Sequence, residues 1–294
     1  MQNKNELFFR NEFTFCMHAC GLIYGLMFTN SLEALLYWYS KGIRMFEIDI
    51  DYAGDEKFVA CHSFSRESFI NMEITNIPNE CTYEWFKQQK LYKKTTNGIT
   101  PMTLEKIFKL LNDKSDIVVM IDPKVYSYKE TCLLLDKIKN YMQIYNVNKD
   151  RVIFETYNED MIRAIRNYEE LVNYQYCVDD EIQMGTSQKM RSWDIDTLIN
   201  FLKRNNIWIL SYPWKFAVEN IVNLERFHKE GFVIFSKTRN DILVDLIKRS
   251  GINVNIIDYL VTNEQREELS IYKEEYYRKY IKRIDNLFGK NINN

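Results

Sequence analysis

Short apolar runs alternate with longer amphipathic stretches along most of this chain. The short runs are rich in β-branched and aromatic residues, which is typical of buried strands. The longer stretches repeat apolar residues every three or four positions, which is typical of helices that cover a core. The pattern predicts strands over residues 13–17, 44–50, 117–121, 152–154, 174–177, 207–210, 232–235 and 255–261.

Helices are predicted between these strands, at residues 31–41, 104–111, 128–145, 159–167, 195–204, 218–229 and 241–250, with a terminal helix from about 264. The first has Asn30 or Ser31 as its N-cap and Gly42 just beyond its end. About eight strand–helix units imply a parallel sheet, and a closed (β/α)8 TIM barrel is the predicted fold. An open doubly wound sheet is the alternative, but no GxGxxG follows any predicted strand.

One stretch interrupts the alternation. Residues 58–61 predict a short extension or hairpin after the second strand. Residues 63–100 are polar and lack a clear period, and loops of this length are usually functional or form a small subdomain. We therefore predict a single TIM-barrel domain over residues 1–294, with a small insertion at about 63–100.

Two carboxylates lie two positions apart in the second predicted strand. Glu47 and Asp49 then point to one face of it, because alternate side chains of a strand share a face. Burying both is costly unless a positive group joins them, and a hard divalent cation prefers oxygen ligands. His18 and His62, two of only three histidines, flank this strand in sequence. The combination indicates metal-assisted acid–base chemistry, although an ion pair with Arg44 is an alternative for the carboxylates.

Further polar residues follow the next strands. Asp122 and Lys124 come after the third strand and Glu155 ends the fourth. Barrel enzymes build their active sites at these carboxyl ends. Asp122 and Lys124 have a simpler alternative, which is to pair with each other, and Glu155 suits a structural role as well as a binding one. Trp214, on the same predicted rim, either walls the substrate pocket or packs its loop.

Composition narrows the class of protein. The chain has 294 residues, 46% of them hydrophobic, and a formal net charge of −2, which argues against a nucleic-acid partner. No signal peptide or membrane-spanning run is evident, so we expect a soluble, cytoplasmic protein with no integral membrane segment and reduced cysteines. Cys16, His18 and Cys20 would share a strand face and suggest zinc, but the neighbouring carboxylates favour a harder ion.

Several of these residues lie in motifs with a familiar order and spacing. They are HACG at 18–21, NSLEA at 30–34, FEID at 46–49, CH at 61–62 and IDPK at 121–124. Together they resemble the glycerophosphodiester phosphodiesterase family, a member of the phospholipase-C-like phosphodiesterase superfamily. The match is specific over the first half of the chain. The second half is similar in rhythm, with weaker likeness at IWILSYPW (207–214) and YLVTN (259–263).

The resemblance implies a barrel enzyme that hydrolyses a small-molecule glycerophosphodiester to glycerol phosphate and an alcohol, using a divalent ion such as Mg²⁺ or Ca²⁺. By position, His18 and His62 are its acid–base pair. Glu47, Asp49 and Asp122 are its metal ligands, and Lys124 faces the phosphate.

Three positions depart from the family's usual pattern, at Ala19 (commonly Arg), Asp122 (commonly Glu) and Asn263 (commonly Asp). Two further functions stay open: a phospholipase-C-like lyase acting on a lipid or surface-polymer phosphodiester, and a non-catalytic binding protein that keeps the fold. The motifs leave the alcohol, the ion and the oligomeric state open.

Overall fold

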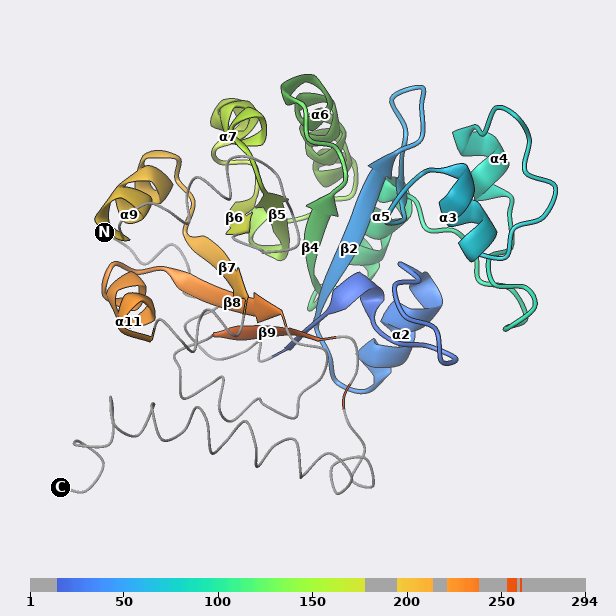
Figure 1. Cartoon of the computed structure of the whole chain (residues 1–294), viewed down its shortest axis with the longest axis horizontal. Coiled ribbons are helices and arrows are strands. Elements are labelled where there is room, and N and C mark those ends of the chain that lie inside the picture. Colours follow the sequence, from blue (N-terminus) through green and yellow to red (C-terminus); the bar gives the residue numbers. More distant parts are fainter. Residues whose placement is uncertain (1–14, 178–194, 214–220, 238–252, 258–259, 261–294) are drawn as a thin grey trace.

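Eight parallel strands close into a barrel in this computed structural model (Figure 1). The structure describes residues 15–177, 195–213, 221–237, 253–257 and 260. The order around the sheet is β1-β9-β8-β7-β6-β5-β4-β2, and a β1–β2 pairing closes the ring. A further strand, β3, pairs antiparallel with the end of β2. The predicted (β/α)8 barrel is confirmed, and the open sheet is excluded by the closure.

The strands are β1 (Phe15–Met17), β2 (Met45–Tyr52), β3 (Phe58–Ala60), β4 (Val118–Pro123), β5 (Val152–Thr156), β6 (Asn173–Cys177), β7 (Ile209–Pro213), β8 (Val233–Lys237) and β9 (Val254–Ile257). The described helices are α2 (Leu32–Ser40), α3 (Arg66–Asn71), α4 (Tyr83–Lys87), α5 (Leu104–Asp113), α6 (Tyr128–Ile144), α7 (Glu159–Ile165), α9 (Ile195–Arg204) and α11 (Ile221–Lys229). Among these described helices, none has the length and apolar character needed to cross a bilayer.

Alternate residues of each strand serve two separate cores. Inward-facing side chains fill the barrel and form one buried cluster, made up of Cys16, Met45, Val118, Met120, Ile153, Ile209, Val233, Phe235, Val254 and Ile256. The residues between them pack against the surrounding helices in a second, larger cluster. Because these strands are buried on both faces, they are continuously apolar in sequence, and the short apolar runs therefore predicted them correctly. Polar residues on the inward face therefore interrupt an otherwise apolar interior.

The helices begin where their capping residues predict. Ser31, Thr103, Ser127 and Asn158 each accept a backbone N–H bond from the first turn of the following helix. Of the two N-caps considered for α2, Ser31 is the one used, since its Oγ accepts from Ala34 N at 3.2 Å. The side chain of Asn30 is therefore not needed as the N-cap of α2 and can make other contacts.

Residues 63–100 form a helical insertion beside β2 and β3 (Figure 1). It contains α3, α4 and a short antiparallel bridge between Leu91 and Ile99. Phe69 and Phe86 are fully buried between these pieces, 5.5 Å apart between ring centroids. The sequence shows no period here because helices of five and six residues make less than two turns.

Most predicted elements lie within a few residues of the observed ones. The helix at Ile195–Arg204 has the predicted bounds, and β7 and β8 each extend beyond the predicted ends. The predicted helices at 241–250 and from about 264 lie outside the described residues. That residues 1–294 form one domain stays a prediction.

A close approach of backbone to a side chain fixes the chain after β1. Gly21 has a φ of +90°, and a Cβ there would lie 2.5 Å from Cδ1 and Nε1 of Trp38. The indole is not free to move, because its Nε1 donates to the carbonyl of Leu22 at 2.9 Å. Gly25, four residues on, has a φ of +77° but nothing within 4 Å of such a Cβ.

We expect Gly21→Ala to destabilise the fold by about 3 kcal/mol, because left-handed strain of about 1–2 kcal/mol adds to the collision with Trp38. Gly25→Ala carries the strain alone and is the matched control, with an expected loss of about 1 kcal/mol. Urea unfolding monitored by circular dichroism measures both. Equal losses in the two variants would contradict the close packing of Gly21 against Trp38.

Candidate functional site

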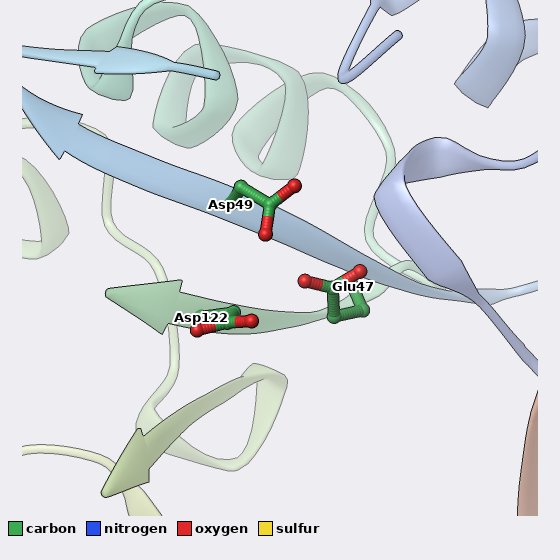
Figure 2. Close-up of side chains that lie close together, drawn as sticks. All are labelled: Glu47, Asp49 and Asp122. Atoms are coloured by element: carbon green, nitrogen blue, oxygen red, sulfur yellow. The ribbon is translucent and has the colours of Figure 1, made fainter. Parts of the chain in front are cut away.

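Three carboxylates converge at the carboxyl end of the barrel (Figure 2). Glu47 and Asp49 point inward from β2, and Asp122 points inward from β4. The parallel register pairs Asp49 with Asp122, so these two side chains stand next to each other. One oxygen from each of the three carboxylates lies within 4.8 Å of the others. Sequence analysis placed Glu47 and Asp49 at the end of their strand, but β2 continues to Tyr52 because β3 pairs with its last residues.

A single ammonium group bridges the two aspartates. Lys124 follows β4, and its Nζ lies 2.7 Å from Asp49 Oδ1 and 2.6 Å from Asp122 Oδ2. All three side chains are largely buried, with the lysine side chain 11% exposed. The simple pairing of Asp122 with Lys124 is therefore present, but it is part of a larger cluster that includes Asp49. Charge-assisted contacts of this length in a poorly solvated site are strong.

Backbone and amide donors from the segment after β1 hold the two carboxylates of β2. Ala19 donates its N–H to Glu47 Oε2. Asn30 donates from Nδ2 to Asp49 Oδ2 at 2.8 Å and accepts from the backbone N–H of Asp49 at 2.9 Å. Asn30 adopts a left-handed φ of 48°, a conformation that asparagine tolerates better than most residues. The sequence indicated Asn30 as a possible helix cap and as part of the NSLEA motif, but gave no sign of its contact with Asp49.

A second chain of hydrogen bonds reaches Asp122 from β5 and β6. The hydroxyl oxygen of Tyr157 lies 2.6 Å from Asp122 Oδ1 and 2.7 Å from Glu155 Oε2. Gln175 on β6, opposite Glu155 in the register, donates from Nε2 to Glu155 Oε1 at 2.6 Å. Tyr157, Glu155 and Gln175 are all essentially buried.

The charges of this cluster shift its pKa values in opposite directions. Burial alone would raise the pKa of Asp49, but the charge of Lys124, followed by His18 and the hydrogen bonds, outweighs it and lowers that pKa to about 2. Burial opposes the charged form of Lys124 as well, yet the surrounding carboxylates raise its pKa well above the ordinary value. This pair is therefore charged throughout the physiological range.

The two glutamates behave differently. Burial is the main reason that the pKa of Glu47 is raised well above its ordinary value, and the charges of Asp49 and Asp122 raise it further. Burial also raises the pKa of Glu155 to about 7, with Asp122 as the next contribution. Within the described part of the chain, Glu47 Oε1 is buried and has no hydrogen-bond partner. The cluster thus carries negative charge that its own lysine does not fully balance.

The two predicted catalytic histidines lie in different surroundings. His18 is in a short 3-10 turn directly after β1, with Nε2 3.9 Å from Glu47 Oε2 and its ring edge-on to Phe28 at 5.0 Å. His62 follows β3 and is exposed. Among the described residues, no hydrogen bond or ion pair joins His62 to the carboxylates.

Two alternatives from the sequence, an ion pair with Arg44 and a zinc site at Cys16, His18 and Cys20, are not supported by the structure. Arg44 pairs with Asp116 at 2.6 Å, so it does not neutralise the β2 carboxylates. Cys16, His18 and Cys20 do not share a strand face, because β1 ends before the turn in which Ala19 and Cys20 have positive φ. Burial is the main reason that the pKa of both thiols is raised in the metal-free protein. Trp214 lies outside the described residues.

Four residues near this site escaped sequence reasoning as site residues: Asn30, Tyr157, Gln175 and Lys237. Gln175 had a detectable signal, since it is a polar residue at an inward position of a strand. Lys237 ends β8, which is also a detectable signal, and its charge lowers the pKa values of both Glu47 and Glu155. Tyr157 follows a strand by one residue and looks like an ordinary core aromatic in sequence.

Several solved structures share this barrel. The glycerophosphodiester phosphodiesterase of Parabacteroides distasonis has a similar structure, with a TM-score of 0.63 at 16% identity, covering 88% of this chain and 98% of that one. The glycerophosphodiester phosphodiesterase of Thermotoga maritima has a TM-score of 0.59 at 19% identity, covering 88% of this chain and 98% of that one. An Oleispira antarctica phosphodiesterase was solved with the product sn-glycerol-3-phosphate. It has a TM-score of 0.64 at 14% identity, covering 84% of this chain and 93% of that one. No curated protein sequence matches the chain significantly.

Those identities establish the fold alone, and the family rests on the sequence. The sequence model of the glycerophosphoryl diester phosphodiesterase family matches residues 23–260, well over half of the chain. This range contains β2 and β4 with their three carboxylates. The chain therefore belongs to the glycerophosphoryl diester phosphodiesterase family and is an enzyme of the phosphoric diester hydrolase class.

Proposed function

We propose that this enzyme hydrolyses glycerophosphodiesters to glycerol phosphate and an alcohol, with a divalent metal ion held by Glu47, Asp49 and Asp122. The observation that carries the proposal is the buried trio of carboxylates within 4.8 Å of one another, with Lys124 beside them. A phosphodiester needs positive charge for its non-bridging oxygens, and it needs groups that accept and donate protons.

The three carboxylates suit a hard divalent ion. They offer oxygen ligands, and Glu47 keeps a buried oxygen without a partner among the described residues. Glu47, Asp49 and Asp122 carry three negative charges when ionised, against one positive charge on Lys124, which leaves the cluster short of cations. A bound Mg²⁺ or Ca²⁺ would supply positive charge to the phosphate oxygens.

Lys124 and the histidines take the remaining roles in this proposal. Lys124 pairs with both aspartates and presents positive charge to the phosphate. His18 and His62 divide the proton transfers, one accepting the proton of the attacking hydroxyl and the other protonating the leaving alkoxide. His62 is exposed at the rim, where a bound substrate can reach it.

Glu155 and Tyr157 are better suited to positioning than to direct contact with substrate. The Tyr157 hydroxyl has one proton but faces a carboxylate on each side. Both contacts become hydrogen bonds when Glu155 is protonated, because Glu155 then donates to Tyr157 and Tyr157 donates to Asp122. The pKa of about 7 for Glu155 supports this arrangement. Glu155 and Trp214 stay predictions as substrate-binding residues, as does the cytoplasmic location.

We expect chelation, His18→Ala and His62→Ala each to abolish hydrolysis of glycerophosphocholine. Losing one acid–base group costs about 10²–10⁴-fold in rate. The control is His228→Ala on α11, which removes the remaining histidine of the chain outside the proposed site. Choline release measures all four reactions. Full activity of His62→Ala, or undiminished activity with EDTA, would contradict the assigned roles.

Tyr157→Phe tests the positioning of Asp122. Removing the hydroxyl leaves Asp122 Oδ1 without its donor, so we expect metal affinity to fall by about 10–100-fold. Titration calorimetry with Mg²⁺ or Ca²⁺ measures the affinity. Tyr174→Phe is the matched control, because it removes the hydroxyl of another buried tyrosine, which donates to the carbonyl of Tyr168 at 2.6 Å. Equal affinities for both variants and the wild type would refute the positioning role.

Glu155→Gln tests where the proton lies. In the metal-free protein the folded state binds a proton at Glu155 up to about pH 7, while the unfolded state releases it near the ordinary value of 4.5. The free energy of unfolding contributed by this group therefore falls as pH rises through that window, and it is constant above it. Glutamine mimics the protonated acid without titrating, so the variant should gain up to about 3 kcal/mol over the wild type between pH 4.5 and 7.5.

Urea unfolding at several pH values in EDTA measures that gain. Glu105→Gln, which changes an exposed glutamate on α5, is the control and should show no such gain. A constant difference in stability between Glu155→Gln and the wild type across this range would rule out a protonated Glu155.

A further inference from the structure

A hairpin with exposed apolar side chains stands beside the proposed active site. We call residues 22–28 the rim hairpin; they lie between the turn of His18 and α2 (Figure 1). Tyr24 is 65% exposed, and Met27 and Phe28 are each 44% exposed. No Asp, Glu, Lys or Arg occurs anywhere from residue 13 to residue 32. Large apolar side chains grouped on a surface without charges usually mark a binding site.

The rim hairpin is built to hold its shape. Ile23 and Leu26 exchange backbone hydrogen bonds of 3.0 and 2.8 Å across a turn formed by Tyr24 and Gly25, both of which have positive φ. The indole of Trp38 fixes its start by donating to the carbonyl of Leu22. A fixed apolar surface loses little entropy when a ligand covers it.

The C-terminal end of the rim hairpin is tied to the proposed catalytic residues. The Phe28 ring lies edge-on against His18, with centroids 5.0 Å apart. Just after it, Asn30 binds Asp49, and its backbone N–H donates to Ala19 O at 3.2 Å. Since His18 Nε2 also lies 3.9 Å from Glu47 Oε2, a phosphodiester bound at the carboxylates would lie within one side chain of Phe28, to which the rest of the rim hairpin is joined.

The side chains of the rim hairpin indicate which kind of chemical group would bind to it. The segment itself offers no Asp, Glu, Lys or Arg to an ionic group, whereas a hydrocarbon chain gains from covering exposed aromatic and thioether side chains. We propose that the preferred substrate is a glycerophosphodiester with one acyl chain, of the lysophospholipid type, whose chain lies on the rim hairpin. This inference rests on the proposed function and names its substrate class.

A pair of choline esters tests the proposal. Octanoyl lysophosphatidylcholine, used as monomers, and glycerophosphocholine differ by the acyl chain alone. In each, water attacks phosphorus and the bond to the choline oxygen breaks, so choline release measures both. We expect kcat/KM to be at least about tenfold higher for the acylated substrate, since a few buried methylenes account for such a ratio.

The variant pair Tyr24→Asn with Met27→Ser should abolish that preference. Asparagine tolerates the left-handed backbone at position 24, and both side chains are exposed, so the fold is preserved. Ile144→Ser at the end of α6, which removes another well-exposed apolar side chain away from the site, should keep the preference of the wild type.

Three results would overturn the inference. A wild type with equal kcat/KM for both substrates, or a double variant that keeps the preference, would show that the rim hairpin does not bind the chain. If kcat/KM were higher for the acylated substrate only when phosphatidylcholine vesicles were added, the rim hairpin would bind a membrane surface instead of the acyl chain. In all three cases hydrolysis of glycerophosphocholine leaves the proposed function standing. If neither substrate is hydrolysed with any added divalent ion, the proposed function itself is wrong.

Discussion

The site depends on keeping like charges close together in a buried place. The register of β2 against β4 sets Asp49 opposite Asp122, and the period of the strand adds Glu47 to the same face. Pairing β2 with β4 therefore creates the repulsion. Lys124 offsets it most directly, because its ammonium contacts both aspartates and its raised pKa keeps it charged. The negative charge that is left over is what makes the cluster suited to a further cation.

The orientation of the carboxylates depends on segments that are distant in sequence. Ala19 and Asn30 reach Glu47 and Asp49 from the segment after β1, while Tyr157 reaches Asp122 from the end of β5. These donors come into place only when β1 pairs with β2 and β4 pairs with β5. The geometry of the candidate ligands is thus a property of the closed barrel and not of any single strand.

The sequence was informative where local periodicity carries the information. The period of two placed Glu47 and Asp49 on one face, and the alternation of strands and helices predicted the barrel. The local pattern did not predict features that depend on a contact with a segment distant in sequence. The length of β2 is set by its pairing with β3, and the helices of the insertion are too short to show a period. Tyr157 looks like a core aromatic until its hydroxyl is seen between Asp122 and Glu155.

The residue after His18 shows how recognition differs on this side of the site. The family commonly has arginine there, whereas Ala19 is fully buried, has a φ of 46° and gives its N–H to Glu47. The position therefore supplies a donor to a carboxylate and no charge to a substrate. The chain that follows is uncharged up to residue 32, and its exposed side chains are apolar. On the proposed function, the phosphate relies on Lys124 and the bound ion, while the atoms beside it meet a surface that favours hydrocarbon. An alanine that carries no charge and a following segment with exposed apolar side chains thus act in the same direction, because both leave this side of the site without ionic contacts for a substrate.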